Sequence, residues 1–245
     1  MSNKMKKILS IDFDYFQKVS PEVLRTCYPD GVDLSPEIST IVWSGYYANP
    51  MQEEKLNGVS IMEQELKKIK EVILNQQSDI PAMIAGSHLQ IYDFIHTFAD
   101  TSDKLAVAHI DMHHDMFNKN PEVDCGNWLG HITEEYRTEI LWIANPVTAE
   151  MYGLTDDAEP SGKAVCDLMK TSIAEIEGKT FDMIFLCRSD IWLPPHLDSY
   201  FSDLCKVMKQ HFNEIILEQK IDKPREYQQY AEQMKKAYQK LEAMR

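Results

Sequence analysis

The chain has 245 residues, of which 44% are hydrophobic, and a formal net charge of −14 at pH 7. This charge argues against a nucleic-acid partner, because the phosphate backbone would be repelled, and it suits a cationic substrate. The five cysteines form no CxxC pair, and no apolar run approaches the roughly 20 residues that cross a bilayer, so we expect a cytoplasmic protein with reduced thiols and no membrane partner.

Short apolar runs predict buried strands along the whole chain. They cover residues 7–16, 81–88, 105–115, 138–145 and 181–192. Apolar residues at three- and four-residue spacing predict helices between these strands. The helices cover 60–76, 89–98 and 162–176. Near-continuous apolar strands that alternate with helices indicate an α/β fold with a mostly parallel sheet.

The remaining segments indicate one domain, residues 1–245, because no compositional break divides the chain. Segments 28–58 and 118–130 lack clear periodicity and predict long loops. Segment 224–245 carries tyrosines and aliphatic residues on one helical face. It predicts an amphipathic helix that packs on the body of the protein, or one that mediates contact between copies.

The densest group of metal-type side chains is HIDMHHDMF, residues 109–117. Its alternate positions are Asp111, His113 and Asp115. In a strand, residues two apart project to one face, so these three side chains are predicted to converge. Two carboxylates and an imidazole suit a divalent cation such as manganese, whereas a hydrogen-bonded polar cluster is the alternative. We interpret His109 and His114 as supporting or structural residues.

Similar residues end the other predicted strands. Asp12 and Asp14 end the first strand, His88 follows the second, and Asp190 lies near the end of the last. Ligands of parallel sheets bind at the carboxyl ends of the strands. The sequence therefore predicts one site that all these strand ends share.

Two segments extend this prediction to a known family. DMHHD, residues 111–115, resembles the Asp-Ala-His-x-Asp signature of the arginase–agmatinase (ureohydrolase) family. AGSHLQI resembles the family's Gly-Gly-Asp-His-Ser segment, which implies that His88 is a metal ligand. The family has a three-layer α/β/α fold and a dinuclear manganese site. The resemblance therefore implies this fold and two Mn²⁺ ions.

A third segment resembles the family's substrate loop. CGNWLGH is similar to its Ser-Gly-Asn-x-His-Gly motif, which implies that Asn127 contacts the substrate. His131 lies two residues later than the family's histidine, and the resemblance implies that it is the catalytic acid–base group.

The fourth segment departs from the family pattern. CRSDIWLPP resembles Asp-x-Asp-x-x-Asp-Pro, which makes Asp190 a ligand, but Arg188 replaces the first aspartate, which normally bridges both metals. SIDFDYF offers a second Asp-x-Asp, so we infer that the first strand lies next to the strand that ends at Asp190 and fills the place of the family's last strand. We assign Asp14 to the metal and Asp12 to the guanidinium, with the reverse assignment and a capping or solvated acidic pair as alternatives.

Three segments, SIDFDYF, DMHHD and CRSDIW, are most similar to the peptide arginases, a divergent branch of the family. These enzymes convert arginine within ribosomally made precursor peptides to ornithine and release urea. The resemblance implies that the partner is an arginine-containing precursor peptide, with a groove formed by segments 28–58 and 118–130, and that the chain can self-associate. The implied metal ligands are His88, Asp111, His113, Asp115, Asp190 and Asp14, and Asp115 and His131 are the implied catalytic pair.

Three other interpretations remain open. The chain could hydrolyse a small free guanidine such as arginine or agmatine. It could be a single-metal amide hydrolase of the histone-deacetylase type, with zinc held by Asp111, His113 and one further aspartate. It could also bind metal without catalysis, because Arg188 stands at a bridging position.

Overall fold

The computed structural model describes residues 4–29, 34–116, 121–152 and 168–243. Within these ranges a seven-stranded sheet forms the centre of the protein, in the order β7-β6-β5-β1-β8-β4-β9. Every neighbouring pair of these strands is parallel. The strands are β1 (Met5–Asp12), β4 (Ala82–Ala85), β5 (Lys104–Asp111), β6 (Arg137–Ala144), β7 (Leu168–Lys170), β8 (Met183–Cys187) and β9 (Ile215–Leu217).

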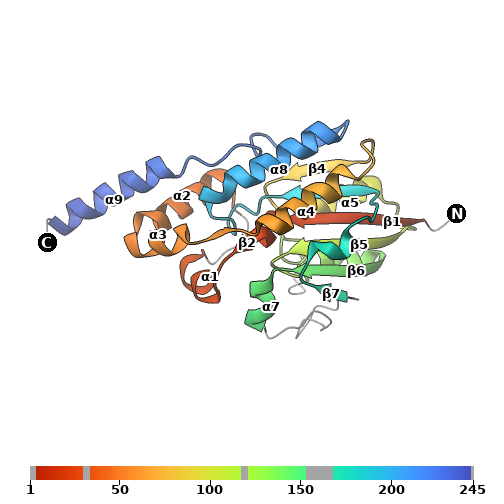
Figure 1. The fold of residues 1–245 in the computed structure, drawn as a ribbon, viewed down its shortest axis with the longest axis horizontal. Helices are drawn as coiled ribbons and strands as arrows, with labels where there is room; N and C mark the ends of the chain where they lie inside the picture. The colour runs from red at the N-terminus through yellow and green to blue at the C-terminus, as the bar shows by residue number, and fades with distance from the viewer. Residues whose placement is uncertain (1–3, 30–33, 117–120, 153–167, 244–245) are drawn as a thin grey trace.

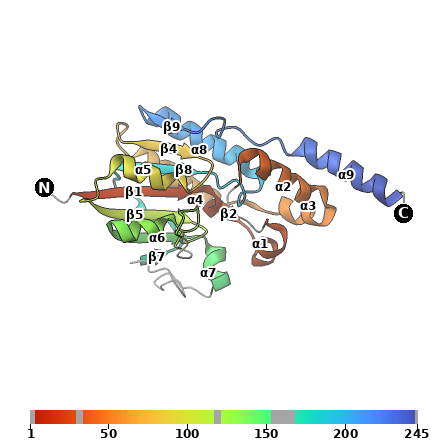
Figure 2. The ribbon, with the colours of Figure 1, turned by 180° about the vertical axis from the view of Figure 1, so that it is seen from behind.

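Helices cover both faces of the sheet, which makes three layers and confirms the predicted α/β fold. Helices α4 and α8 lie over one face (Figure 1), and α5 and α6 lie over the other (Figure 2). The helices are α1 (Pro21–Cys27), α2 (Pro36–Ala48), α3 (Pro50–Asn57), α4 (Glu63–Leu74), α5 (Gln90–Phe98), α6 (Trp128–Glu135), α7 (Pro146–Tyr152), α8 (Asp198–His211) and α9 (Gln228–Ala243). None of the helices in the described ranges is both long and apolar enough to traverse a bilayer.

The central strands are buried on both faces, which explains their continuous apolar sequences. In β1, Ile8 packs in the core on the α5 and α6 side, whereas Leu9 and Ile11 belong to the core on the other side. Helices close both cores, and the buried polar residues of β1 are Ser10 and Asp12, near its carboxyl end. This polar end is where the candidate site lies.

Five predicted strands correspond to β1, β4, β5, β6 and β8, and two predicted helices correspond to α4 and α5. Two other predictions are wrong. Segment 28–58 contains α2 and α3 rather than a long loop, and each of these helices begins with a capping side chain followed by proline. Residues 168–176 form β7 and a 3₁₀ turn rather than a helix, and residues 162–167 lie outside the described ranges.

The other two predicted segments are partly as expected. Residues 121–127 contain no helix or strand, and α6 begins at Trp128, while residues 118–120 lie outside the described ranges. The C-terminal helix α9 packs on α2, and its beginning is its most buried part, because Ala231 and the preceding Tyr227 are buried. The rest of α9 extends away from the sheet (Figures 1 and 2), and Tyr238 and Leu241 are exposed.

Candidate metal centre

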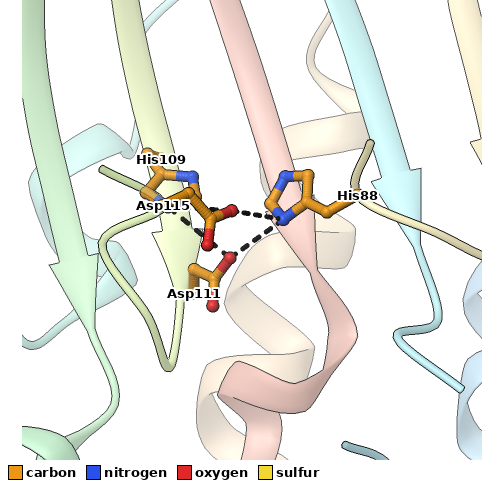
Figure 3. A group of neighbouring side chains, drawn as sticks. All are labelled: His88, His109, Asp111 and Asp115. Atoms are coloured by element: carbon orange, nitrogen blue, oxygen red, sulfur yellow. Dashed lines mark ion pairs between the residues drawn. The ribbon is translucent and has the colours of Figure 1, made fainter. Parts of the chain in front are cut away.

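The site lies where β1, β4, β5 and β8 end, and its first group of ligands surrounds His88. The His88 Nδ1 atom is 2.9 Å from Asp111 Oδ2, 3.0 Å from Asp115 Oδ2 and 3.2 Å from Asp12 Oδ2. Figure 3 shows the imidazole directed at the Asp111 and Asp115 carboxylates, with His109 on their other side. The His109 Nε2 atom lies 3.5 Å from Asp111 Oδ2, and all these side chains are buried.

Contacts with β1 and β8 fix the orientation of the His88 imidazole. Its Nε2 atom lies 2.7 Å from the Ser10 hydroxyl on β1. Its ring stacks on Phe185 of β8, with ring centroids 5.6 Å apart and an interplanar angle of 4°. Side chains of β1 and β8 therefore hold the Nδ1 atom toward the carboxylates.

A second group consists of Asp14, Asp111 and His113. The His113 Nδ1 atom is 3.3 Å from Asp14 Oδ2 and 3.5 Å from Asp111 Oδ1. Its side chain is 24% exposed and its ring lies 4.9 Å from that of Trp192, so this group is on the accessible side of the site. Asp111 belongs to both groups, with one carboxylate oxygen directed to each.

The chain bends after Asp111, and this bend separates the predicted triad. The His113 amide donates to Asp111 Oδ1 at 2.6 Å, and Asp115 has a positive φ of 51°. Strand alternation therefore ends at Asp111, and the prediction that all three side chains converge on one point is wrong. Asp115 reaches the His88 group, where its Oδ2 accepts from Trp128 Nε1 at 2.6 Å, and His113 reaches the Asp14 group.

Asp12 and Asp14 reach the site because β1 lies between β5 and β8, as its inferred position beside the Asp190 strand required. The strand ends at Asp12, and residues Phe13–Phe16 form a 3₁₀ turn. Asp12 Oδ1 accepts from the Asp14 amide at 3.0 Å, and Asp14 Oδ1 accepts from the Met112 amide at 3.1 Å. The two carboxylates thus extend to different groups, with Asp12 beside His88 and Asp14 beside His113.

The concentration of buried charge shifts the protonation of the carboxylates. Burial and the Asp12 carboxylate raise the pKa of Asp14 to about 6. Burial and the neighbouring carboxylates, Asp115 above all, raise the pKa of Asp111 well above its ordinary value. Burial also acts to raise the pKa of Asp115, but the His88 imidazole outweighs it and lowers this pKa overall. Carboxylates this close compete for positive charge.

The histidines respond in two ways. Burial alone lowers the pKa of His88, but Cys187, Asp115 and Asp111 outweigh it and raise this pKa well above 6.5. The pKa of His113 is likewise raised, against burial, by Asp111 and Asp14. The pKa of His109 is lowered to about 3, chiefly by burial. His88 and His113 therefore supply the positive charge that the carboxylates require when protein groups alone surround them.

The donor set fits a divalent cation. Within the described ranges, four buried side-chain atoms meet no partner in hydrogen-bonding geometry, although three of them lie 2.9–3.3 Å from an oppositely charged group: Asp14 Oδ2, His88 Nδ1, His109 Nδ1 and Asp111 Oδ2. Buried polar atoms are normally satisfied, so unpaired ones clustered at one site require an explanation. Carboxylate oxygens and imidazole nitrogens are the ligands that first-row divalent ions prefer, and three such groups of side chains meet here.

The predicted ligand Asp190 is not brought to these groups. It forms a two-point ion pair with Arg188, in which Arg188 Nε bonds Asp190 Oδ1 and Nη2 bonds Oδ2 at 3.1 Å. Arg188 Nη1 also donates to the carbonyls of Ile221 and Lys223, at 3.1 and 2.8 Å. Asp190 is therefore the counterion of a buried arginine, which corrects its predicted role. The arginine faces the C-terminal segment instead of a cation.

The predicted substrate loop is also used differently. The Asn127 side chain is buried, with Oδ1 accepting from the Asp124 amide at 2.7 Å and Nδ2 donating to the Glu122 carbonyl at 3.1 Å. Its amide stabilises the loop before α6 rather than facing a substrate, which corrects that prediction. His131 lies on α6 with its ring 6.5 Å from that of Tyr92, and it belongs to neither ligand group.

His109 precedes Asp111 by two positions in β5, so both project to one face of the strand. Its Nε2 atom lies 3.1 Å from the His113 carbonyl, which agrees with the supporting role inferred for it, and it also lies among the ligand-type side chains around His88.

One further residue was not predicted. The Cys187 sulfur lies within 4.8 Å of potential ligand atoms of Asp12 and His88. No spacing in the sequence signals it, because its place depends on the pairing of β8 with β1.

Comparison with models of protein families, with curated proteins and with solved structures gives no match. Function is therefore inferred from the geometry of the site and from the motifs that the sequence carries.

Proposed function

We propose that this chain is a manganese-dependent hydrolase that converts arginine residues of a peptide to ornithine and releases urea. The observation that carries the proposal is the position of Asp111, whose two oxygens face different ligand groups, one around His88 and one around His113. A carboxylate shared in this way is suited to bridge two divalent ions. Two ions that share a water lower its pKa, so that it can attack an electrophilic carbon at neutral pH.

The residues fit the two positions without rearrangement of the fold. His88, Asp12 and Asp115 would hold the deeper ion, with His109 at its edge. Asp14 and His113 would hold the outer ion. The aspartates at both positions would then be balanced by metal charge instead of by the histidines. This charge balance supports a metal-ligand role for both Asp12 and Asp14, in preference to a direct guanidinium contact for Asp12.

The substrate class follows from charge and access. The outer group is reached beside His113 and Trp192, both partly buried. The face of an indole attracts a guanidinium by a cation–π interaction, and the acidic protein as a whole favours the approach of a cation. The preference for arginine within a peptide rests on the three segments that resemble peptide arginases, because the loop of 28–58 that was expected to form a groove is helical.

A mass-spectrometric assay tests the proposal. The purified, manganese-loaded protein is incubated with an arginine-containing peptide and, in separate reactions, with free arginine and agmatine. We expect the peptide alone to lose the mass of cyanamide, with urea released in equal amount. The Asp111→Asn variant should show neither product, and the same peptide with lysine for arginine should be unchanged.

Two outcomes contradict the proposal in different ways. Turnover of the free guanidines but not of the peptide would refute the peptide substrate and retain the hydrolysis. No turnover of any guanidine by a protein that binds manganese would refute guanidine hydrolysis itself.

A further inference from the structure

Cys187 is the last residue of β8 and lies directly beside the proposed centre. It pairs with Asp12 in the register of β1 and β8, so that both side chains project to the same face of the sheet. Its side chain is fully buried. Register and burial together place a sulfur atom in the layer where the deeper ligands meet.

The immediate neighbours of this sulfur are metal-type ligands. Asp12, His88 and Cys187 each offer one ligand atom, and these atoms lie within 4.8 Å of one another. An independent observation points to a ligand here, because the buried His88 Nδ1 atom faces three carboxylate oxygens at 2.9–3.2 Å but meets none of them in hydrogen-bonding geometry. Cys205 of α8 is also fully buried, but within the described ranges it belongs to no such group.

The outer position is chemically different. Its ligands are Asp14, Asp111 and His113, which offer oxygen and nitrogen but no sulfur. Oxygen ligands suit manganese, whereas a cysteine sulfur favours softer ions such as Zn²⁺, Co²⁺ or Fe²⁺. The two positions of the centre therefore differ in the type of ligand atom, which decides which metal binds.

We propose that Cys187 is a sulfur ligand of the deeper ion and that the two positions prefer different metals, a softer ion at the deeper one and manganese at the outer one. This inference rests on the metal centre of the proposed function and adds to it the metal preference of one position. It predicts that a protein loaded with manganese alone binds its deeper ion less tightly than one offered cobalt.

Cobalt reports the bond directly, because a cysteine sulfur bound to Co²⁺ gives a charge-transfer absorption in the near ultraviolet. The weaker visible bands of Co²⁺ report the bound ion whether or not sulfur is a ligand. We expect the near-ultraviolet band in the wild-type protein and in the matched control Cys205→Ser. We expect Cys187→Ser and Cys187→Ala to lose the band, keep visible cobalt absorption, and bind the deeper Co²⁺ at least about tenfold more weakly.

Each other outcome overturns the inference. Bound cobalt without the near-ultraviolet band in the wild type, or a band that survives in both Cys187 variants, would show that Cys187 is not a ligand and would leave the proposed hydrolase intact. Failure of folded wild-type protein to bind cobalt or manganese at all would refute the metal centre and this inference together. Circular dichroism of every variant confirms that folded proteins are compared.

Discussion

Asp111 is the residue on which both ligand groups depend, and the chain holds it from several sides. Its carbonyl accepts from Trp142 Nε1 at 3.2 Å and from the Asn145 amide at 3.3 Å. Its carboxylate lies between His88 and His113. Fixing the backbone of Asp111 therefore fixes the distance between the two positions.

Substitution of Asp111 should differ in outcome from substitution of a residue in one group. We expect Asp111→Asn to lose both ions, because the carboxylate serves both positions, and His113→Ala to lose only the outer ion. Elemental analysis of the dialysed proteins measures the difference. His131→Ala is the matched control and should retain both ions, since His131 belongs to neither group. Equal losses in the Asp111 and His113 variants would contradict the shared role of Asp111.

The histidines predict how pH affects the metal-free protein. The pKa values of His88 and His113 are raised well above 6.5, so the folded protein keeps protons that the unfolded chain releases. A state that holds more protons is disfavoured as pH rises, so the metal-free protein should lose stability as the pH increases above 6.5.

Metal should reverse this trend, because binding requires ionised carboxylates and neutral imidazoles and therefore releases protons. We expect the increase in Tm caused by Mn²⁺ to grow with pH over the same range. Thermal unfolding with chelator and with Mn²⁺, at a series of pH values, measures both effects. A metal-free Tm that rises with pH above 6.5 would contradict the raised histidine pKa values.

At the residue scale, the sequence predicted the site as far as strand alternation applies. Asp12 and His88 were located because they end or follow recognisable strands. Alternation failed beyond Asp111, where the backbone turns through the positive φ of Asp115. Asp190 was misassigned because its ion pair with Arg188 depends on the carbonyls of residues 221 and 223, which are distant in sequence.

At the scale of elements, the decisive feature is that β1 is inserted between β5 and β8. The sequence indicated only the place of β1 beside β8, because β1 ends in an Asp-x-Asp that the strand ending near Asp190 lacks. The strands β7 and β9 were not predicted, since three residues are too few to show a period. Helix α2 was not predicted, because it lacks the usual pattern of buried apolar and exposed polar residues: Ser39 and Ser44 are buried, while Ile38 and Ile41 are exposed.

One residue joins these elements at the edge of the site. Asn145 follows β6 and is buried, and its Nδ2 donates to the carbonyls of Tyr15 and Gln17, at 2.7 and 2.9 Å. It therefore ties the turn that carries Asp14 to the strand next to Asp111.

We expect Asn145→Ala to lower the free energy of unfolding by about 2–4 kcal/mol, because two buried carbonyls lose their donor. It should also weaken the binding of the outer ion, whose ligand Asp14 lies on the released turn. Urea denaturation and metal titration measure the two effects. Thr138→Ala, at the opposite end of β6, is the control, and its local bond to the Tyr136 carbonyl should be worth about 1 kcal/mol. An unchanged free energy of unfolding for Asn145→Ala would refute the proposed stabilising role of its hydrogen bonds.

At the scale of the whole molecule, the C-terminal segment is fixed to the body by two buried arginines. Arg225 pairs with Asp198 at 2.7 and 2.8 Å and donates to the carbonyls of Asp190 and Leu193. Arg188 holds the carbonyls of residues 221 and 223. Beyond Ala231, by contrast, helix α9 is mostly exposed.

These contacts predict that the stability of the fold depends on the segment around Arg225 but not on the exposed end of α9. We expect Arg225→Ala to lower the free energy of unfolding by about 3–5 kcal/mol, because Asp198 would remain buried with only the more distant Arg188 guanidinium, 3.7 Å away, to balance its charge. Removal of residues 236–245 should leave it nearly unchanged, and Lys235→Ala, which breaks partly exposed ion pairs, should cost less than about 1 kcal/mol. Chemical denaturation of the three variants measures how much unfolding free energy each one loses. A truncation as damaging as Arg225→Ala would contradict this prediction.

The central position of β1 also has a consequence for the time course of folding. The first strand of the chain pairs with β8, whose residues Met183–Cys187 are synthesised much later. Contacts between such distant segments form slowly, because the chain loses the entropy of closing a long loop before these contacts can stabilise it. The His88 group is therefore complete only after β8 has docked, because β4 joins β1 through β8. Added metal should therefore slow unfolding of the finished protein while leaving its rate of folding almost unaltered.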